Sequence, residues 1–171
     1  WLSEKIHGSS GRYLWQDGRM HCGSHSNWKK DDPKSIWWMA LRNTPSLEEF
    51  CKHNTDVTVY GEVYGMVKDF KYGVGNSLGV QFATFDLLQG STWLDPQEAR
   101  ELGSALPWVP TVGIISFNLE YILSMAEGNS RVPGAAHMRE GIVVSPIKER
   151  SHPEIGRVKL KLVSNTFLER L

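Results

Sequence analysis

Residues 57–66 read Val-Thr-Val-Tyr-Gly-Glu-Val-Tyr-Gly-Met, and this stretch predicts a strand. Its three valines and Gly61 recur at every second position, which places them on one face of the strand. Glu62 interrupts this apolar strand between two glycines. A carboxylate is costly to bury without a partner, and glycines let a ligand or another backbone come close. The stretch therefore predicts a strand that carries a functional carboxylate.

Further strands are predicted on both sides of this stretch. They cover residues 12–15 and 19–23, which form a hairpin around Asp17-Gly18, and residues 81–88, 141–146 and 157–162. Residues 28–35 are polar and predict a loop.

Helices are predicted between the strands. They cover residues 36–41, residues 47–53 after a Ser46/Glu49 capping box, a segment from Asp95-Pro96 to about Gly103, and residues 118–127 with Gly128 as the C-cap. In the last of these, residues 119, 122, 123 and 126 form an apolar stripe. The order of elements predicts an α+β fold with largely antiparallel strands. The sequence contains neither a Gly-x-Gly-x-x-Gly motif nor a Walker loop.

The composition is that of a folded single domain. The chain has 171 residues, of which 40% are hydrophobic and 22% charged, which excludes disorder and coiled coils. No apolar run reaches the ~18 residues of a membrane-spanning helix. Residues 1–85 carry ten basic and nine acidic side chains, and residues 86–171 carry nine and ten. Without a global basic field, any site for a polyanion must be a local cluster.

Two cysteines, Cys22 and Cys51, are too few for a secreted disulfide scaffold. They predict reduced thiols in an intracellular protein of the cytoplasm or nucleus that is not secreted. A zinc site is an alternative, because His21, Cys22 and His25 are close in sequence and Cys51 and His53 follow. Their spacing is not that of a standard zinc finger. Three tryptophans, at positions 28, 37 and 38, either pack in the fold or stack on RNA bases.

Besides Glu62, charged residues suited to binding a phosphate compound occur at three further points of the sequence. Lys159 and Lys161 are two apart, so a strand would direct both to one face, where they would suit a phosphate. Glu140 leads into an apolar strand, and with Glu62 it would suit a ribose hydroxyl and a divalent metal. Lys5 could be a nucleophile. Taken singly, each group also fits a solvated strand face or surface ion pair.

Five motifs stand in order along nearly the whole chain. They are Glu4-Lys5-Ile6-His7-Gly8, Gly61-Glu62-Val63-Tyr64-Gly65, Phe85-Asp86-Leu87-Leu88, Glu140-Gly141-Ile142-Val143-Val144 and Lys159-Leu160-Lys161. This ordered set resembles the covalent nucleotidyltransferases, which include ATP-dependent polynucleotide ligases and mRNA capping enzymes. The resemblance implies two antiparallel sheets with flanking helices and a nucleotide pocket between them.

The inner residues of the motifs indicate a branch of this superfamily. DNA ligases and capping enzymes usually carry Asp before the glycine of the first motif, where this chain carries His7. That form resembles the RNA ligases related to the second phage RNA ligase. Residues 140–150 resemble the subgroup that has an N-terminal OB-like module. Because the chain starts at Trp1, just ahead of the first motif, we expect residues 1–171 to be an adenylyltransferase domain that lacks an accessory domain.

The resemblance also implies roles for individual residues. Lys5 would attack ATP and carry AMP covalently, and Lys159 and Lys161 would be catalytic cations. Glu140 would hold Mg²⁺ or Mn²⁺, and Glu62 would hold a ribose hydroxyl. The rest of the implied ATP site consists of Glu4 at the adenine edge, Ile6, Gly8, Ser10 near the ribose, and Phe85 stacked on adenine.

One position departs from the family pattern. Related ligases often carry an arginine about twenty residues after the nucleophile, where this chain has His25, with Arg19 upstream. The sequence leaves open which of the two takes that place.

The implied activity is that of an ATP-dependent RNA ligase. Such an enzyme passes AMP to an RNA 5′-phosphate and then joins a 3′-hydroxyl end. We expect a monomer that binds RNA and no membrane. The alternatives are a DNA ligase, a GTP-dependent capping enzyme, or an RNA-binding relative that has lost catalysis.

Overall fold

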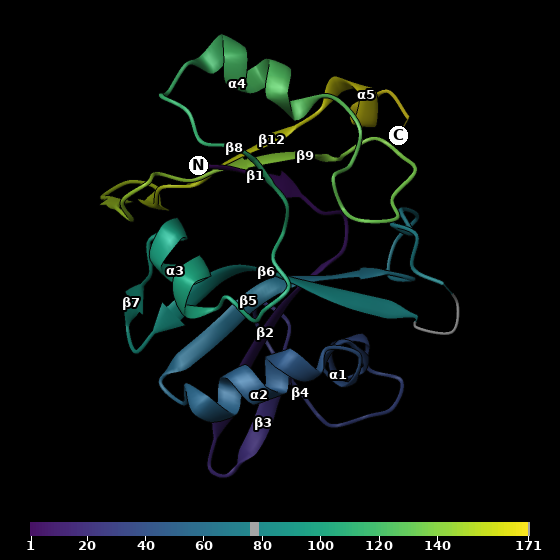
Figure 1. The fold of residues 1–171 in the computed structure, drawn as a ribbon, viewed down its shortest axis with the longest axis vertical. Helices are drawn as coiled ribbons and strands as arrows, with labels where there is room; N and C mark the ends of the chain where they lie inside the picture. Colours follow the sequence, from purple (N-terminus) through teal and green to yellow (C-terminus); the bar gives the residue numbers. More distant parts are fainter. Residues whose placement is uncertain (76–78, 171) are drawn as a thin grey trace.

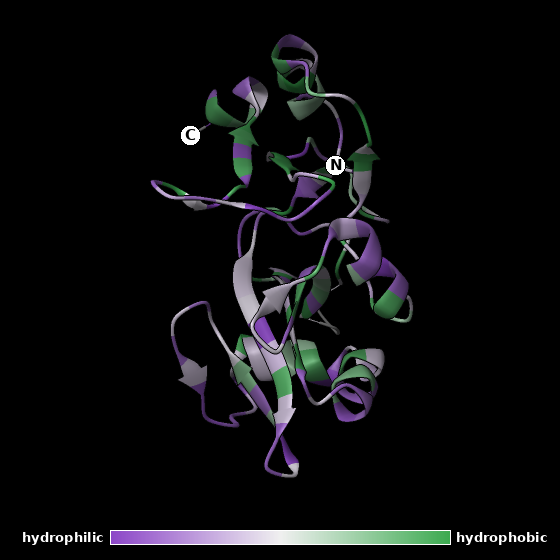
Figure 2. Cartoon of the chain, turned by 90° about the vertical axis from the view of Figure 1, so that its left-hand side faces the viewer, coloured by the Kyte–Doolittle hydropathy of each residue, from purple (hydrophilic) through white to green (hydrophobic). Residues whose placement is uncertain are grey.

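The computed structural model describes residues 1–75 and 79–170 and contains two antiparallel β-sheets, one above the other in Figure 1. The larger sheet has the strand order β4-β3-β2-β5-β6-β7. Its strands are β2 (Ser9–Gln16), β3 (Arg19–Gly23), β4 (Trp28–Lys29), β5 (Val57–Gly65), β6 (Val80–Gln89) and β7 (Thr92–Trp93). The hydrophilic end of the β2–β3 hairpin is at the bottom of Figure 2. Asp17 and Gly18 form its turn, both with positive φ, as the sequence predicts.

The smaller sheet has the order β12-β9-β1-β8. Its strands are β1 (Leu2–Lys5), β8 (Thr111–Gly113), β9 (Gly141–Val144) and β12 (Leu160–Val163), and a separate hairpin joins β10 (Ser151–His152) to β11 (Gly156–Arg157). The chain passes from β1 of this sheet directly into β2 of the larger one. The expected α+β fold with two antiparallel sheets is confirmed.

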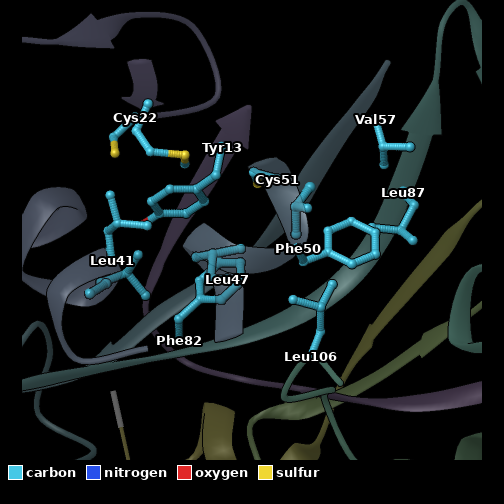
Figure 3. Packing of buried hydrophobic residues seen from close by; sticks show 14 of the residues in the cluster. Tyr13, Cys22, Leu41, Leu47, Phe50, Cys51, Val57, Phe82, Leu87 and Leu106 are labelled. Carbon is cyan, nitrogen blue, oxygen red and sulfur yellow. The ribbon is translucent and has the colours of Figure 1, made fainter. Parts of the chain in front are cut away.

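Helices flank the sheets. They are α1 (Ile36–Arg42), α2 (Pro45–His53), α3 (Pro96–Leu102), α4 (Leu119–Ala126) and α5 (Asn165–Leu168). The main core lies where α1 and α2 pack on the larger sheet (Figure 3). There the rings of Tyr13 and Phe82 meet edge to face, with centroids 4.9 Å apart. Cys22 and Cys51 are free, buried thiols of the same core, as the sequence predicts.

Several predicted elements differ in their bounds; the strand predicted over 12–15, for example, is Ser9–Gln16, and the one predicted over 141–146 ends at Val144. The second helix begins at Pro45 rather than after Ser46, because a proline at the first helical position has a suitable φ and no N–H to satisfy. Residues 28–35 are not all loop, since Trp28 and Lys29 pair with β3. The segment predicted as one strand, 157–162, is divided between β11 and β12.

The apolar stripe of α4 is only partly used. Ile122 and Ala126 are buried against the smaller sheet. Leu119 and Leu123, which belong to the same predicted stripe, are 54% and 51% exposed. A periodic pattern therefore identified the helix correctly and overestimated the face that it buries.

Removal of a core side chain gives a test of this packing. Leu87 on β6 is fully buried, so we expect Leu87→Ala to lower the free energy of unfolding by about 2–5 kcal/mol through lost transfer energy and a residual cavity. Leu102, which is 40% exposed, is the matched control, and Leu102→Ala should cost less than about 0.5 kcal/mol. Urea unfolding measures both. Equal losses in the two variants would contradict the assignment of Leu87 to the core.

Candidate active site

The first and fourth motifs meet in the smaller sheet. Lys5 ends β1 and is paired with Gly141, the first residue of β9. Glu140 precedes that strand and is 7% exposed. The register brings the two side chains together, and the Lys5 Nζ donates to Glu140 Oε1 at 2.5 Å. Lys5 and Glu140, the nucleophile and the metal ligand expected from the sequence, are thus in direct contact.

The glycine of the first motif explains how Glu62 reaches this pair. A Cβ on Gly8 would lie 2.2 Å from the backbone oxygen of Val63, so only glycine lets the chain pass so close to β5. Burial raises the pKa of Glu62 to about 7, with the charge of Glu140 in the same direction. Lys5, Lys161 and a hydrogen bond from the Gly8 backbone oppose that rise. Glu62 therefore takes up a proton near neutral pH in the isolated chain.

Asp86, from the third motif, is the anchor for the cations on the opposite side. It is 8% exposed and accepts from Lys159 Nζ at 2.5 Å. The Arg157 guanidinium makes two bonds to the same carboxylate, of 2.8 and 3.1 Å, and two more to Glu149. Burial lowers the pKa of Lys159, although Asp86 opposes this. β11 pairs with β10 and β12 pairs with β9, so the chain changes its strand partner between Arg157 and Leu160.

His7 extends the contacts of Glu140 away from Lys5. Its Nδ1 is 3.3 Å from Glu140 Oε2, and its Nε2 is 3.0 Å from Asp69 Oδ1. The imidazole therefore lies between two carboxylates. The imidazole also packs against Phe70 and Phe167, with centroid distances of 5.7 and 5.3 Å. His7 is therefore fixed from both sides.

A pocket of about 610 Å³ lies beside Lys5. Its lining contains most of the residues that the sequence analysis selected, namely Glu4, Lys5, Ile6, Ser10, His25, Glu62, Phe85, Lys159 and Lys161. Two selected residues support it from outside the lining: Glu140, through its contact with Lys5, and Gly8, through its close approach to β5. Of the two candidates for the family arginine, His25 lines this pocket, whereas Arg19 lies on a different groove.

The carboxylate of Glu4 is engaged elsewhere. The side chain is 1% exposed, and its oxygens accept from Ser130 Oγ at 2.5 Å and from the backbone N–H of Arg131 at 2.6 Å. Alternation along β1 directs Ser3 and Lys5 to the other face of the strand. Glu4 therefore secures residues 130–131 with its side chain, and any contact of Glu4 with a base is left to its backbone.

Five polar or aromatic residues of the lining received no role from the sequence. They are Ser3, Tyr60, Asp86, Trp93 and Arg157. A signal for two of them was present, because Tyr60 and Arg157 each stand two residues before a selected residue of a predicted strand. The period of two places such pairs on one face. Trp93 had no comparable signal: it reaches the pocket with its ring 3.9 Å below the Arg157 guanidinium.

The residues considered for zinc do not form a site. Within residues 1–75 and 79–170, no group of three or more His, Cys, Asp or Glu side chains could hold a metal ion by itself. Cys22 and Cys51 are buried in the main core. In the same described part of the chain, no helix is long and apolar enough to cross a membrane.

Comparison with known proteins agrees with this geometry. The family model for RNA ligases matches residues 1–163, so the chain belongs to the RNA ligase family. No curated protein matches it significantly.

Among solved structures, an RNA ligase from Naegleria gruberi has the same nucleotidyltransferase fold. A ligand-free variant of it matches with a TM-score of 0.80 and 22% identity, over 99% of this chain and 50% of that one. Variants solved with ATP and Mn and with AMP and Mn match with the same TM-score and identity, over 99% of this chain and 51% of theirs. This chain thus spans about half the length of these solved structures.

The raised pKa of Glu62 predicts a pH dependence of stability. The pKa is about 7 in the folded chain against an ordinary 4.5, so the folded chain holds the proton more tightly than the unfolded chain does. The free energy of unfolding should therefore fall as the pH rises from about 4.5 to about 7. Glu62→Gln should remove this fall. Relative to the wild type, its free energy of unfolding should therefore rise by about 1–3 kcal/mol between these two pH values.

Urea unfolding at a series of pH values measures this difference. Glu154→Gln is the matched control, because Glu154 is exposed, and its pH curve should follow that of the wild type. Parallel curves for Glu62→Gln and the wild type would show that the pKa of Glu62 is not raised.

Proposed function

We propose that this chain is the adenylyltransferase domain of an ATP-dependent RNA ligase, in which Lys5 carries AMP. The observation that carries the proposal is the position of Lys5, at a pocket of about 610 Å³ that two further lysines and Glu62 also line. The volume and the mixture of cations, a carboxylate and Phe85 suit a nucleotide. Membership of the RNA ligase family supports RNA as the polynucleotide.

In the first step, the Lys5 amine attacks the α-phosphorus of ATP. A nitrogen–phosphorus bond forms, and the bond from that phosphorus to pyrophosphate breaks. An ordinary lysine has a pKa of about 10.4, so Lys5 must first give up a proton. Glu140 Oε1 already accepts a hydrogen bond from Lys5 Nζ and offers a place for it. Lys159 and Lys161, which line the same pocket, would stabilise the negative charge of the departing pyrophosphate and of the transferred phosphate.

Other residues would orient the nucleotide. Phe85 offers an apolar ring to the base, and Glu62 offers a carboxylate to a ribose hydroxyl. His25 and Ser10 lie on the same lining and can donate hydrogen bonds to the ribose or a phosphate. A nucleotide held on several sides has its α-phosphorus fixed in front of Lys5, which removes much of the entropic barrier to attack.

The residues around Glu140 fit a divalent metal, Mg²⁺ or Mn²⁺. Glu140 Oε2 is buried and has no well-formed hydrogen bond among the described residues, since His7 approaches it only at 3.3 Å. Such an oxygen suits a hard cation, and Mg²⁺ typically combines one or two carboxylates with water and substrate phosphates. When bound, the metal would neutralise phosphate charge and favour the unprotonated form of Lys5. The solved Naegleria gruberi ligase that holds ATP also holds Mn.

The later steps use the same nucleophile as a leaving group. An oxygen of the RNA 5′-phosphate attacks the phosphorus of lysyl-AMP, the nitrogen–phosphorus bond breaks, and Lys5 recovers its proton. The RNA 3′-hydroxyl then attacks the 5′-phosphorus, and AMP leaves as the phosphodiester forms. Because the chain spans about half the length of the solved ligases, we expect these 171 residues alone to carry out the first step and to join RNA ends poorly.

Covalent labelling tests the first step. We expect the chain to acquire α-labelled AMP from ATP and Mg²⁺ in a band that survives denaturation, and Lys5→Ala to lose it entirely, because the bond is made to that amine. The matched control is Lys68→Ala, at an exposed lysine outside the pocket lining, which should be labelled like the wild type. Equal labelling of Lys5→Ala and the wild type would overturn the assignment of the nucleophile.

The same assay separates the alternatives. A GTP-dependent capping enzyme would be labelled by GTP in place of ATP, and we expect labelling by ATP alone. Joining of DNA ends in preference to RNA ends by the labelled enzyme would indicate a DNA ligase. A folded chain that takes no label under either metal, while still binding RNA, would indicate a relative without catalysis.

A further inference from the structure

A second groove lies outside the nucleotide pocket, along the β3–β4 edge of the larger sheet. It has a volume of about 800 Å³, and α1 and α2 contribute to its walls. The residues that matter for its chemistry are Trp15, Arg19, Trp28, Lys29, Lys30 and Trp38. None of them has a role in the proposed reaction of Lys5.

The groove has a fixed aromatic platform in Trp28. This ring is 46% exposed, yet it is held by two neighbours from the sheet. The Arg12 guanidinium lies 4.0 Å from its centre, and the His21 ring meets it edge to face at 5.9 Å. An exposed tryptophan costs little ordering entropy on binding when it is already immobilised. The ring is therefore prepared for a flat partner such as a nucleobase.

The charges beside this platform are unbalanced. Both acidic residues of the lining are engaged, Asp31 with Arg42 and Glu48 with Lys52. Arg19, Lys29 and Lys30 form no ion pair with any residue in the described part of the chain. Among the described residues, the groove thus has three cations without an ion pair, of which Lys29 has its Nζ 4.8 Å from the centre of the Trp37 ring, in a chain whose net charge is zero. This is the kind of local cluster that a polyanion requires.

The groove and the nucleotide pocket are neighbours. His25 lines the pocket and Trp28 lines the groove, and only a tight turn separates them, in which the Ser24 N–H donates to the Asn27 carbonyl at 2.9 Å. Three residues of chain span at most roughly 10 Å. A nucleic-acid strand whose end lies at Lys5 can therefore continue from the pocket into the groove.

We propose that this groove binds a single-stranded segment of the RNA substrate. One base stacks on Trp28, and backbone phosphates contact Arg19, Lys29 and Lys30. The choice of RNA rests on the proposed function, whereas the aromatic and basic character of the groove does not. An acidic peptide would use the same cations, but it would leave the flat face of Trp28 without a matching partner, so the aromatic platform favours a nucleic acid.

The test measures binding of the chain to a labelled single-stranded RNA of about 12 nucleotides, a length in the range that such grooves cover. Fluorescence anisotropy without ATP gives the dissociation constant from about 50 to 200 mM salt. We expect Trp28→Ala to weaken binding at least about fivefold through lost stacking. Lys30→Ala should weaken binding and reduce the slope of log affinity against log salt by about 0.7, the amount for one phosphate contact. Both side chains are exposed, so both variants should fold.

The matched controls lie around the smaller sheet, where Tyr121 and Arg150 are exposed outside the groove. Tyr121→Ala and Arg150→Ala should leave affinity and salt dependence unchanged. Unchanged RNA binding in both groove variants, equal losses in the controls, or no RNA binding by the wild type would each overturn the proposal. In the first case the groove would serve a partner other than RNA.

ATP labelling of the same variants separates this proposal from the proposed function. Neither Trp28 nor Lys30 lines the nucleotide pocket, so both variants should acquire labelled AMP like the wild type. Normal labelling with unchanged RNA binding would remove the groove proposal and leave the proposed function intact. RNA binding that depends on Trp28, in a wild type that takes no label, would support the groove and contradict the proposed function.

Discussion

The antiparallel pairing of Lys5 with Gly141 is the constraint on which the site depends. It sets the last residue of β1 beside the first residue of β9, so that Glu140 meets Lys5 at 2.5 Å. A Cβ on Gly141 would lie 1.9 Å from the backbone oxygen of Leu162, which means that only glycine admits β12 on the other side of β9. The same backbone contact therefore places the Lys5 pair and the strand that carries Lys161 in one sheet.

Two carboxylates, one in the pocket lining and one beside it, hold the basic side chains of the pocket. Glu140 holds Lys5 and faces His7, and Asp86 holds Lys159 and Arg157. Removing such buried charges from water is costly, and each is retained because an opposite charge lies within hydrogen-bond distance. Glu62 differs from these two carboxylates, since burial raises its pKa to about 7 in spite of the nearby Lys5 and Lys161. The side chains at this pocket are thus held by ion pairs with one another.

Local sequence rules predicted much of the fold and little of its fine geometry. The β2–β3 turn follows from Asp17-Gly18, because both residues tolerate positive φ. The break between β11 and β12 could not be predicted, since it reflects a change of strand partner from β10 to β9, which the local sequence does not specify. The exposure of Leu119 on α4 was missed for a related reason: a helical period identifies an apolar face, whereas the neighbouring sheet decides how much of it is covered.

The sequence by itself determined the order of the five motifs, the strand character of the segment around Glu62, and most of the side chains that line the pocket beside Lys5. These are properties of residue type and spacing, which local geometry converts directly into one face of a strand. Only the tertiary structure decided that the Glu4 carboxylate binds residues 130–131, that Asp86 and Trp93 belong to the pocket, and that His25 rather than Arg19 reaches it. Each of these depends on which distant segments meet, and that is set by the pairing of strands from opposite ends of the chain.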